Sequence, residues 1–231
     1  MQNGRSVLLL GLAIVGLALL LGGGLTMNTR QGTSSPSAPG LSAQARTALL
    51  TLARQQLVAI TSGEGSIVPD PQALPPELRS DAACFVTLEE NGVLRGCMLD
   101  SFTAHEPLYE NVLRNVILAS QDDPRFSPVA RDEVPTIRIE LSVLGPPQPL
   151  TFEGPDDLLH RLTPGEDGVV LKTRFGLSTY LPQVWETFPD PASFLSHLCE
   201  KQGAPADTWK TDPAIQIELY RVTHFAEVDS L

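Results

Sequence analysis

A β-hairpin at residues 84–98 is the feature of this sequence that most constrains its fold. Two runs of strand-forming residues, CFVTLEE and VLRGCM, flank the dipeptide Asn91-Gly92. A two-residue hairpin turn needs positive φ at both turn positions, and Asn-Gly adopts that conformation readily. The sequence therefore predicts two antiparallel strands that must lie side by side in a sheet.

The predicted turn also fixes which side chains of the hairpin share a face. A two-residue loop pairs Val86 with Cys97, and alternation then puts Arg95 and Cys97 on one face. Cys84 lies diagonal to Cys97 on that face, where β-carbons are about 7–8 Å apart. That separation is too long for a disulfide, so we expect two free thiols unless Gly96 introduces a bulge and shifts the pairing.

The rest of the chain alternates between helical and strand periodicity. Ser42 is placed to cap the first helix, and Gly203 to end the last one. This mixture of helices and hairpins indicates an α+β fold with an antiparallel sheet and flanking helices. The expected helices are 43–61, 107–121, 155–162 and 191–202, and the expected strands after the hairpin are 136–144, 168–173, 177–181 and 214–222.

Composition narrows the classes of partner and cofactor. The 231 residues carry 16 Lys+Arg against 27 Asp+Glu, a formal net charge of −11, which argues against binding to nucleic acid. Three cysteines do not form a disulfide framework, and the four histidines have no metal-ligand spacing. No GxSxG, phosphate loop or dinucleotide fingerprint occurs. The sequence thus predicts no cofactor and no metal site, although distant residues could still build a composite one.

The first 27 residues are predicted to be a membrane anchor. Residues 7–21 are uninterrupted apolar sequence, and the next six residues extend the run without charge. A spanning helix needs about 20 such residues. The alternative is a cleaved signal peptide with Gly22 and Gly24 near the cut. Arg5 before the segment favours a domain outside the cytoplasm. Residues 28–40 form a flexible Ser/Pro/Gly linker, and 41–231 form the folded domain.

Cys97 is the first candidate for chemistry. Arg95 is expected beside it, and a nearby cation lowers the pKa of a thiol and so favours the nucleophilic thiolate. Gly96 would let a ligand approach the backbone. The alternative is that Cys97 is a small buried apolar residue and Arg95 the partner of some acid. Cys84 and Cys199 lie in apolar patterns and are expected in the core.

Two further segments bring polar side chains together. The turn Asp123-Pro124-Arg125-Phe126 ends a helix and holds opposite charges at close range. In the strand at 136–144, Glu140 and Ser142 share a face. The alternatives are that Asp123 satisfies backbone donors, that Phe126 fills the core, and that the strand face is solvated.

The motifs LRGC, DPRF, IELSVL, LPQVW and FLSHLCEKQGAP resemble those of the AMMECR domain family, whose bacterial and archaeal members are called AmmeMemoRadiSam system protein A. The resemblance runs from about residue 45 to 225. It implies an α+β fold of two lobes with a cleft, the first and last parts of the domain lying in the larger lobe. The motif residues that it implies are Arg95, Gly96, Cys97, Asp123, Arg125, Phe126, Glu140 and Ser142.

The resemblance also implies partners, namely a Memo-type protein and a radical S-adenosylmethionine enzyme. The sequence departs from the family pattern in two places, and the first concerns the site and the second the partners. Met98-Leu99 stand where the family usually has Ile-Gly, which replaces a permissive backbone position with a bulky one. The membrane segment is the second departure, because members of the family are mostly soluble. A domain outside the cytoplasm could not meet a cytoplasmic radical enzyme, which counts against the implied partners.

Three interpretations of the domain follow. In the first it is a membrane-tethered protein whose Cys97 carries out thiol chemistry on a small molecule, with Arg95 and Glu140 as the other catalytic candidates. In the second the same residues form a binding or adapter site without turnover. In the third they are structural, and an Arg95–Glu140 pair holds two lobes together.

Overall fold

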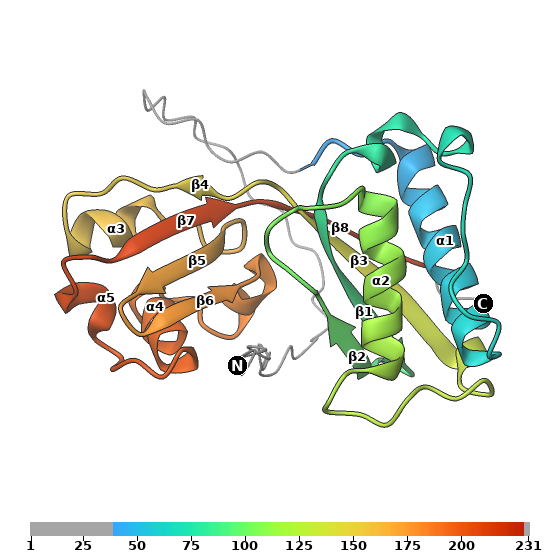
Figure 1. Ribbon diagram of the computed structural model, residues 1–231. Coiled ribbons are helices and arrows are strands. Elements are labelled where there is room, and N and C mark those ends of the chain that lie inside the picture. Colours follow the sequence, from blue (N-terminus) through green and yellow to red (C-terminus); the bar gives the residue numbers. More distant parts are fainter. Residues whose placement is uncertain (1–38, 229–231) are drawn as a thin grey trace, which may run out of the picture.

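The protein, described here by a computed structural model over residues 39–228, is built from two lobes (Figure 1). Each lobe contains one four-stranded antiparallel sheet and its own apolar core. The predicted membrane segment, residues 1–27, and most of the linker lie outside the described residues. Within residues 39–228, no helix is both long and apolar enough to cross a bilayer.

The larger lobe has its helices on one face of its sheet (Figure 1). Apolar side chains on that face pack against the helices, and the opposite face of the sheet is directed away from the helices. The strands, in sheet order β2-β1-β3-β8, are β1 (Ala83–Glu90), β2 (Val93–Met98), β3 (Ile137–Leu144) and β8 (Val222–Ala226), and the helices are α1 (Ala43–Thr61) and α2 (Leu108–Gln121).

The smaller lobe encloses a second core, in which the rings of Trp185 and Phe194 stack with centroids 3.7 Å apart. Its strands, in sheet order β4-β7-β5-β6, are β4 (Gln148–Pro149), β5 (Gly168–Thr173), β6 (Gly176–Tyr180) and β7 (Gln216–Tyr220). Its helices are α3 (Pro155–Arg161), α4 (Pro191–Lys201) and α5 (Thr208–Thr211). Short 3₁₀ helices complete the two lobes: η1 (Pro71–Ala73), η2 (Pro76–Arg79), η3 (Val134–Thr136) and η4 (Pro182–Glu186).

A third apolar cluster joins the lobes. Phe85 and Leu144 from the larger sheet meet Val170 and Tyr220 from the smaller one, and Cys97 belongs to the same cluster. We call this cluster the interlobe core. Because burial of apolar surface drives association, the lobes are packed against each other rather than strung on a linker.

Most predicted elements are confirmed, beginning with the helix at 43–61. The Ser42 hydroxyl accepts a hydrogen bond from the amide of Ala45 at 3.1 Å, as expected of its cap. The prediction of one strand at 214–222 is wrong, because the chain leaves β7 at Arg221 and enters β8 in the other lobe. The α+β class with antiparallel strands and flanking helices is confirmed, and the strands form two sheets, one in each lobe.

The hairpin turn is confirmed, but its register is not. Asn91 and Gly92 both have positive φ, 52° and 75°. A β-bulge then shifts the pairing so that Cys97 lies opposite Thr87 instead of Val86. The bulge also places Cys97 on the face opposite to that of Cys84, which is buried in the larger core. The expectation that both thiols share a face was therefore wrong, while the expectation that both are free is confirmed.

Candidate functional site

Polar side chains gather on the face of the larger sheet that is turned away from α1 and α2. Cross-strand pairing lines up Cys97 on β2 with Thr87 on β1 and Glu140 on β3, and places Ser142 beside His224 on β8. Glu89 on β1 and Arg138 on β3 lie on the same surface, because side chains alternate along each strand. We call it the polar face, and its members are Thr87, Glu89, Cys97, Arg138, Glu140, Ser142 and His224.

Cys97 is buried at the β2 end of the polar face, with 4% of the residue exposed. Burial raises the pKa of its thiol, and the opposing effects of a hydrogen bond from Thr87 and the charge of Arg125 do not outweigh it. The Thr87 hydroxyl donates to Sγ at 3.3 Å. The thiol is therefore protonated at neutral pH in this structure.

Arg95 does not face Cys97, so the predicted role of this cation is wrong. Its guanidinium donates to both carboxylate oxygens of Glu133, at 2.7 and 3.1 Å, and to the carbonyl of Ser127 at 2.9 Å. The predicted Arg95–Glu140 pair is not formed either. The reason is the bulge, since Arg95 is its extra residue and points toward the loop at 127–133.

Gly96 has a packing role that the sequence did not reveal. A β-carbon at this position would lie 2.1 Å from the carbonyl oxygen of Ala119 near the end of α2. The space that we expected a ligand to use is thus filled by helix backbone. Glycine is required here because the strand and the helix approach each other too closely for any side chain.

The turn after α2 holds β2 in place. The Asp123 carboxylate accepts from the amide of Cys97 at 3.0 Å and from Arg125, whose Nη2 also donates to the Cys97 carbonyl at 3.1 Å. Burial alone would raise the pKa of Asp123, but these hydrogen bonds outweigh it and lower the pKa below its ordinary value. Phe126 is half-buried beneath the Arg125 guanidinium. The RGC and DPRF motifs therefore form one interlocked structural unit.

A charged cluster occupies the middle of the polar face. Arg138 Nη1 donates to Glu89 at 3.1 Å and to Glu140. Glu89 is 4% exposed, and its buried Oε1 has no hydrogen-bond partner among residues 39–228. Burial first, and then the charge of Glu140, raise the pKa of Glu89. Sequence reasoning missed Glu89, because nothing in the hairpin pattern distinguishes it from a solvated strand residue.

His224 ends the polar face at the edge strand β8. Its Nδ1 lies 3.2 Å from the Ser142 hydroxyl, and its Nε2 lies 3.9 Å from a carboxylate oxygen of Glu140. The expected proximity of Glu140 and Ser142 on one strand face is confirmed by the register. His224 was missed because its position depends on the separation of β7 from β8.

A groove of about 460 Å³ opens beside His224. Residues of both lobes line it, and the side chain of His224 is 46% exposed there. His224 is thus the member of the polar face that lines this groove. The lining residues are Gly165, Glu166, Pro182, Gln183, Glu186, Arg221, Val222 and His224.

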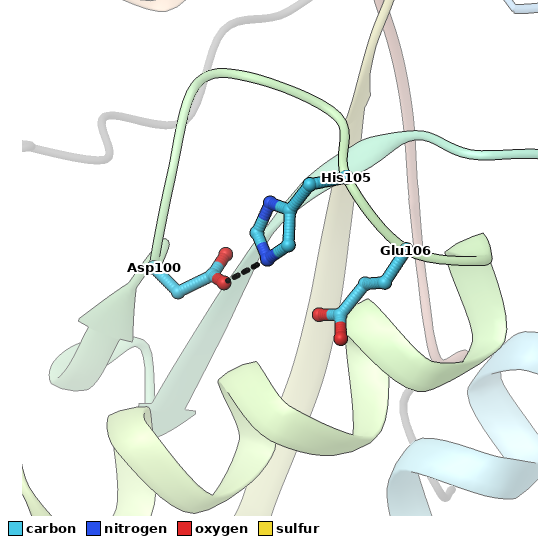
Figure 2. Close-up of side chains that lie close together, drawn as sticks. All are labelled: Asp100, His105 and Glu106. Atoms are coloured by element: carbon cyan, nitrogen blue, oxygen red, sulfur yellow. Dashed lines mark ion pairs between the residues drawn. The ribbon is translucent and has the colours of Figure 1, made fainter.

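Within the described residues one cluster could supply metal ligands, in the segment between β2 and α2. Figure 2 shows Asp100, His105 and Glu106, whose ligand atoms all lie within 4.8 Å of one another. His105 is exposed, as predicted, and pairs with Asp100 at 3.3 Å. Arg114 already holds Glu106 at 2.9 and 2.6 Å and reaches Asp100 at 3.8 Å. A metal ion would have to displace this guanidinium, so the cluster is explained by its ion pairs.

Comparison with known proteins agrees with this fold. The AMMECR1 family matches residues 50–225. A protein of Methanothermobacter thermautotrophicus is 35% identical over 158 residues, 68% of this chain and 81% of that protein. A protein of Thermococcus gammatolerans is 33% identical over 186 residues, 78% and 88% of the two chains.

A solved structure is similar as well. The crystal structure of the uncharacterised protein PH0010 from Pyrococcus horikoshii has 32% sequence identity and a TM-score of 0.69. The match covers 78% of this chain and 89% of that one. The chain described here belongs to the AMMECR1 family.

Proposed function

We propose that the chain binds a small polar molecule on the polar face, which the molecule reaches through the groove beside His224. The observation that carries this proposal is the unpartnered Oε1 of Glu89. Leaving a buried polar atom unpaired costs about 1–3 kcal/mol. Such a cost is expected where a bound molecule supplies the missing partner, and clefts between lobes are common places for ligands.

The surroundings of the motif residues favour ligand binding over a catalytic Cys97 thiolate in the unliganded protein. Arg95, Gly96, Asp123 and Arg125 are all engaged in holding β2, the loop at 127–133 and the end of α2 together. They are positioned as scaffold, and they leave the side chain of Cys97 on the polar face with a raised pKa. The polar face itself supplies the groups for a ligand.

Thiol chemistry on the bound molecule is a second candidate, and one observation favours it. The hydrogen bond from Thr87 and the charge of Arg125 both lower the pKa of Cys97, although burial and the charges of Asp123 and Glu140 raise it. A polar ligand beside the thiol would supply a further hydrogen bond to the thiolate. Alkylation of Cys97 over a pH series tests this: a rate rising well below pH 8 supports it, and labelling only after unfolding contradicts it.

Membrane attachment through residues 7–27 is part of the proposal and rests on the sequence alone. Resistance of the protein to alkaline extraction from membranes would support an uncleaved anchor, whereas release into the soluble fraction would contradict it. An adapter role toward a Memo-type protein rests on the family resemblance. It requires the domain and that partner to lie on the same side of the membrane.

Ligand binding is tested with the full-length chain and a panel of amino acids, amines and organic acids. We expect at least one compound to raise the melting temperature of the wild type and to lose this effect in Glu89→Gln. The matched control is Glu218→Gln, which removes a carboxylate from the smaller lobe, where Glu218 pairs with Lys172. A compound that stabilises all three proteins equally does not bind at the polar face, and that result would count against the proposal.

A further inference from the structure

Lys201, the last residue of α4, holds a half-buried amine against the edge strand β6, and α4 and β6 lie together in the smaller lobe in Figure 1. Its Nζ donates to the carbonyl oxygen of Thr179 at 2.9 Å. The same atom lies 4.8 Å from the centroid of the Tyr180 ring. One carbonyl and one aromatic face are thus the partners of this ammonium group.

No carboxylate of residues 39–228 forms an ion pair with Lys201, although its side chain is half-buried. The sequence contains three lysines, at positions 172, 201 and 210. Lys172 pairs with Glu218 at 2.6 Å, and Lys210 lies exposed over the ring of Trp209. Lys201 is therefore the lysine that combines burial with the lack of a counter-charge.

Burial without a counter-charge favours the neutral amine. It lowers the pKa of Lys201 to about 8, whereas the ordinary value is 10.5. The titratable neighbours are Tyr180 on β6, Glu200 on α4 and Tyr220, whose hydroxyl donates to the Tyr180 carbonyl. The tyrosines are neutral at pH 7.5, because burial raises the pKa of both phenols.

We infer that Lys201 is an acylation site that reacts with activated acyl groups of the thioester class. The neutral ε-amine attacks the carbonyl carbon, a C–N amide bond forms and the C–S bond breaks. The proton lost by nitrogen is taken up by the leaving thiolate, and no atom changes oxidation state. The inference is independent of the polar face, which lies in the other lobe.

The acylated product can keep the hydrogen bond that the amine now makes. A secondary amide keeps one N–H, which can still donate to the carbonyl of Thr179. The reaction also removes a positive charge that the surroundings do not neutralise, and a buried charge of that kind is costly. Acylation is thus compatible with the folded state in a way that it is not for Lys172, whose ion pair with Glu218 would be lost.

The test is acetylation of the folded, full-length chain with a small acetyl thioester, S-acetyl-N-acetylcysteamine, followed by site-resolved mass spectrometry. Lys172 and Lys210 are internal controls. At pH 7.5 we expect Lys201 to react about ten times faster than Lys210, because its larger neutral fraction outweighs its lower basicity. Its rate should level off above pH 8, while the rates at the other two positions keep rising.

Two results would overturn the inference. In the first, Lys201 reacts no faster than Lys210, or reacts only when the protein is unfolded. In the second, the protein acetylated at Lys201 melts at a lower temperature than the unmodified protein. The variant Lys201→Arg checks the assignment, since it should lose the fast acetylation and retain the two slow ones.

Discussion

Gly96 shows how a single residue can look like part of a binding motif and act as a packing contact. A β-carbon there would press on the backbone oxygen of Ala119, which no side-chain rotation can relieve. We expect Gly96→Ala to lower the free energy of unfolding by about 3 kcal/mol. Urea unfolding measures it, with Gly40→Ala as the control, because a β-carbon at Gly40 meets nothing within 4 Å. Equal stability of the two variants would contradict the packing role.

Glu89 makes a prediction about how stability depends on pH. Burial raises its pKa, so the folded protein holds the proton more tightly than the unfolded chain does. Its favourable contribution is present below the unfolded pKa and is lost as pH rises through the folded one. Relative to the wild type, Glu89→Gln should therefore gain stability between pH 4.5 and 7.5. Urea unfolding at both pH values measures the gain, and a constant difference would contradict it.

Lys201 links the inferred reactivity to stability. Its pKa is lowered to about 8, so the folded state releases this proton before the unfolded chain does. Stability should then rise between pH 8 and 10.5, by about 2 kcal/mol from this group. The variant Lys201→Met lacks that contribution, so the wild type should show the steeper rise with pH. Parallel curves from thermal unfolding of the two proteins would rule out the shifted pKa.

At the scale of elements, the bulge in β2 decides the roles of two residues. Arg95, the extra residue, connects the strand to the loop at 127–133 through its hydrogen bonds to Glu133. Cys97 lies opposite Thr87 and accepts a hydrogen bond from its hydroxyl. We expect Arg95→Ala to cost about 2 kcal/mol, because it breaks charged hydrogen bonds to Glu133. Hydrogen exchange in the loop should quicken. The rate of Cys97 alkylation in the folded protein should not change, and a clear fall in that rate would restore the idea that Arg95 acts on the thiol.

The elements show what sequence patterns could and could not predict. Helix α1 and the turn at Asn91-Gly92 depend on local preferences, and both were predicted correctly. The register of β2 depends on the bulge, and one shifted residue moves every following side chain to the other face. The break at Arg221 was invisible for a similar reason, because it is the packing of two lobes, and no local signal, that separates β7 from β8.

Some residues of the candidate site could be predicted from local sequence patterns, and others could not. Cys97, Glu140 and Ser142 were predicted from motifs and strand alternation, and they lie on one face. His224 joins that face only through tertiary structure, and nothing in the hairpin pattern distinguishes Glu89 from a solvated strand residue. Gly96 and Asp123 were also identified from motifs. Their contacts with α2 and β2 show that they have a structural role, which a motif alone does not reveal.

At the scale of the whole molecule, the interlobe core should make the two lobes unfold together. Leu144 belongs to that core and is 5% exposed. Leu144→Ala should lower stability by about 3 kcal/mol and also loosen the coupling of the lobes. Calorimetry should show one transition for the wild type and a broadened or split one for the variant. Leu158→Ala, in the core of the smaller lobe, is the matched control and should lower stability without splitting the transition.

Within residues 39–228, the chain passes between the lobes twice, after β3 and again between β7 and β8. The two crossings are joined by a hydrogen bond from the amide of Gly145 to the carbonyl of Arg221, at 2.7 Å. Together they form a narrow two-stranded ribbon, which resists stretching and bends most readily about one axis. A swing of the lobes about that axis would widen or narrow the groove beside His224, because Arg221 and Val222 belong to both the ribbon and the groove.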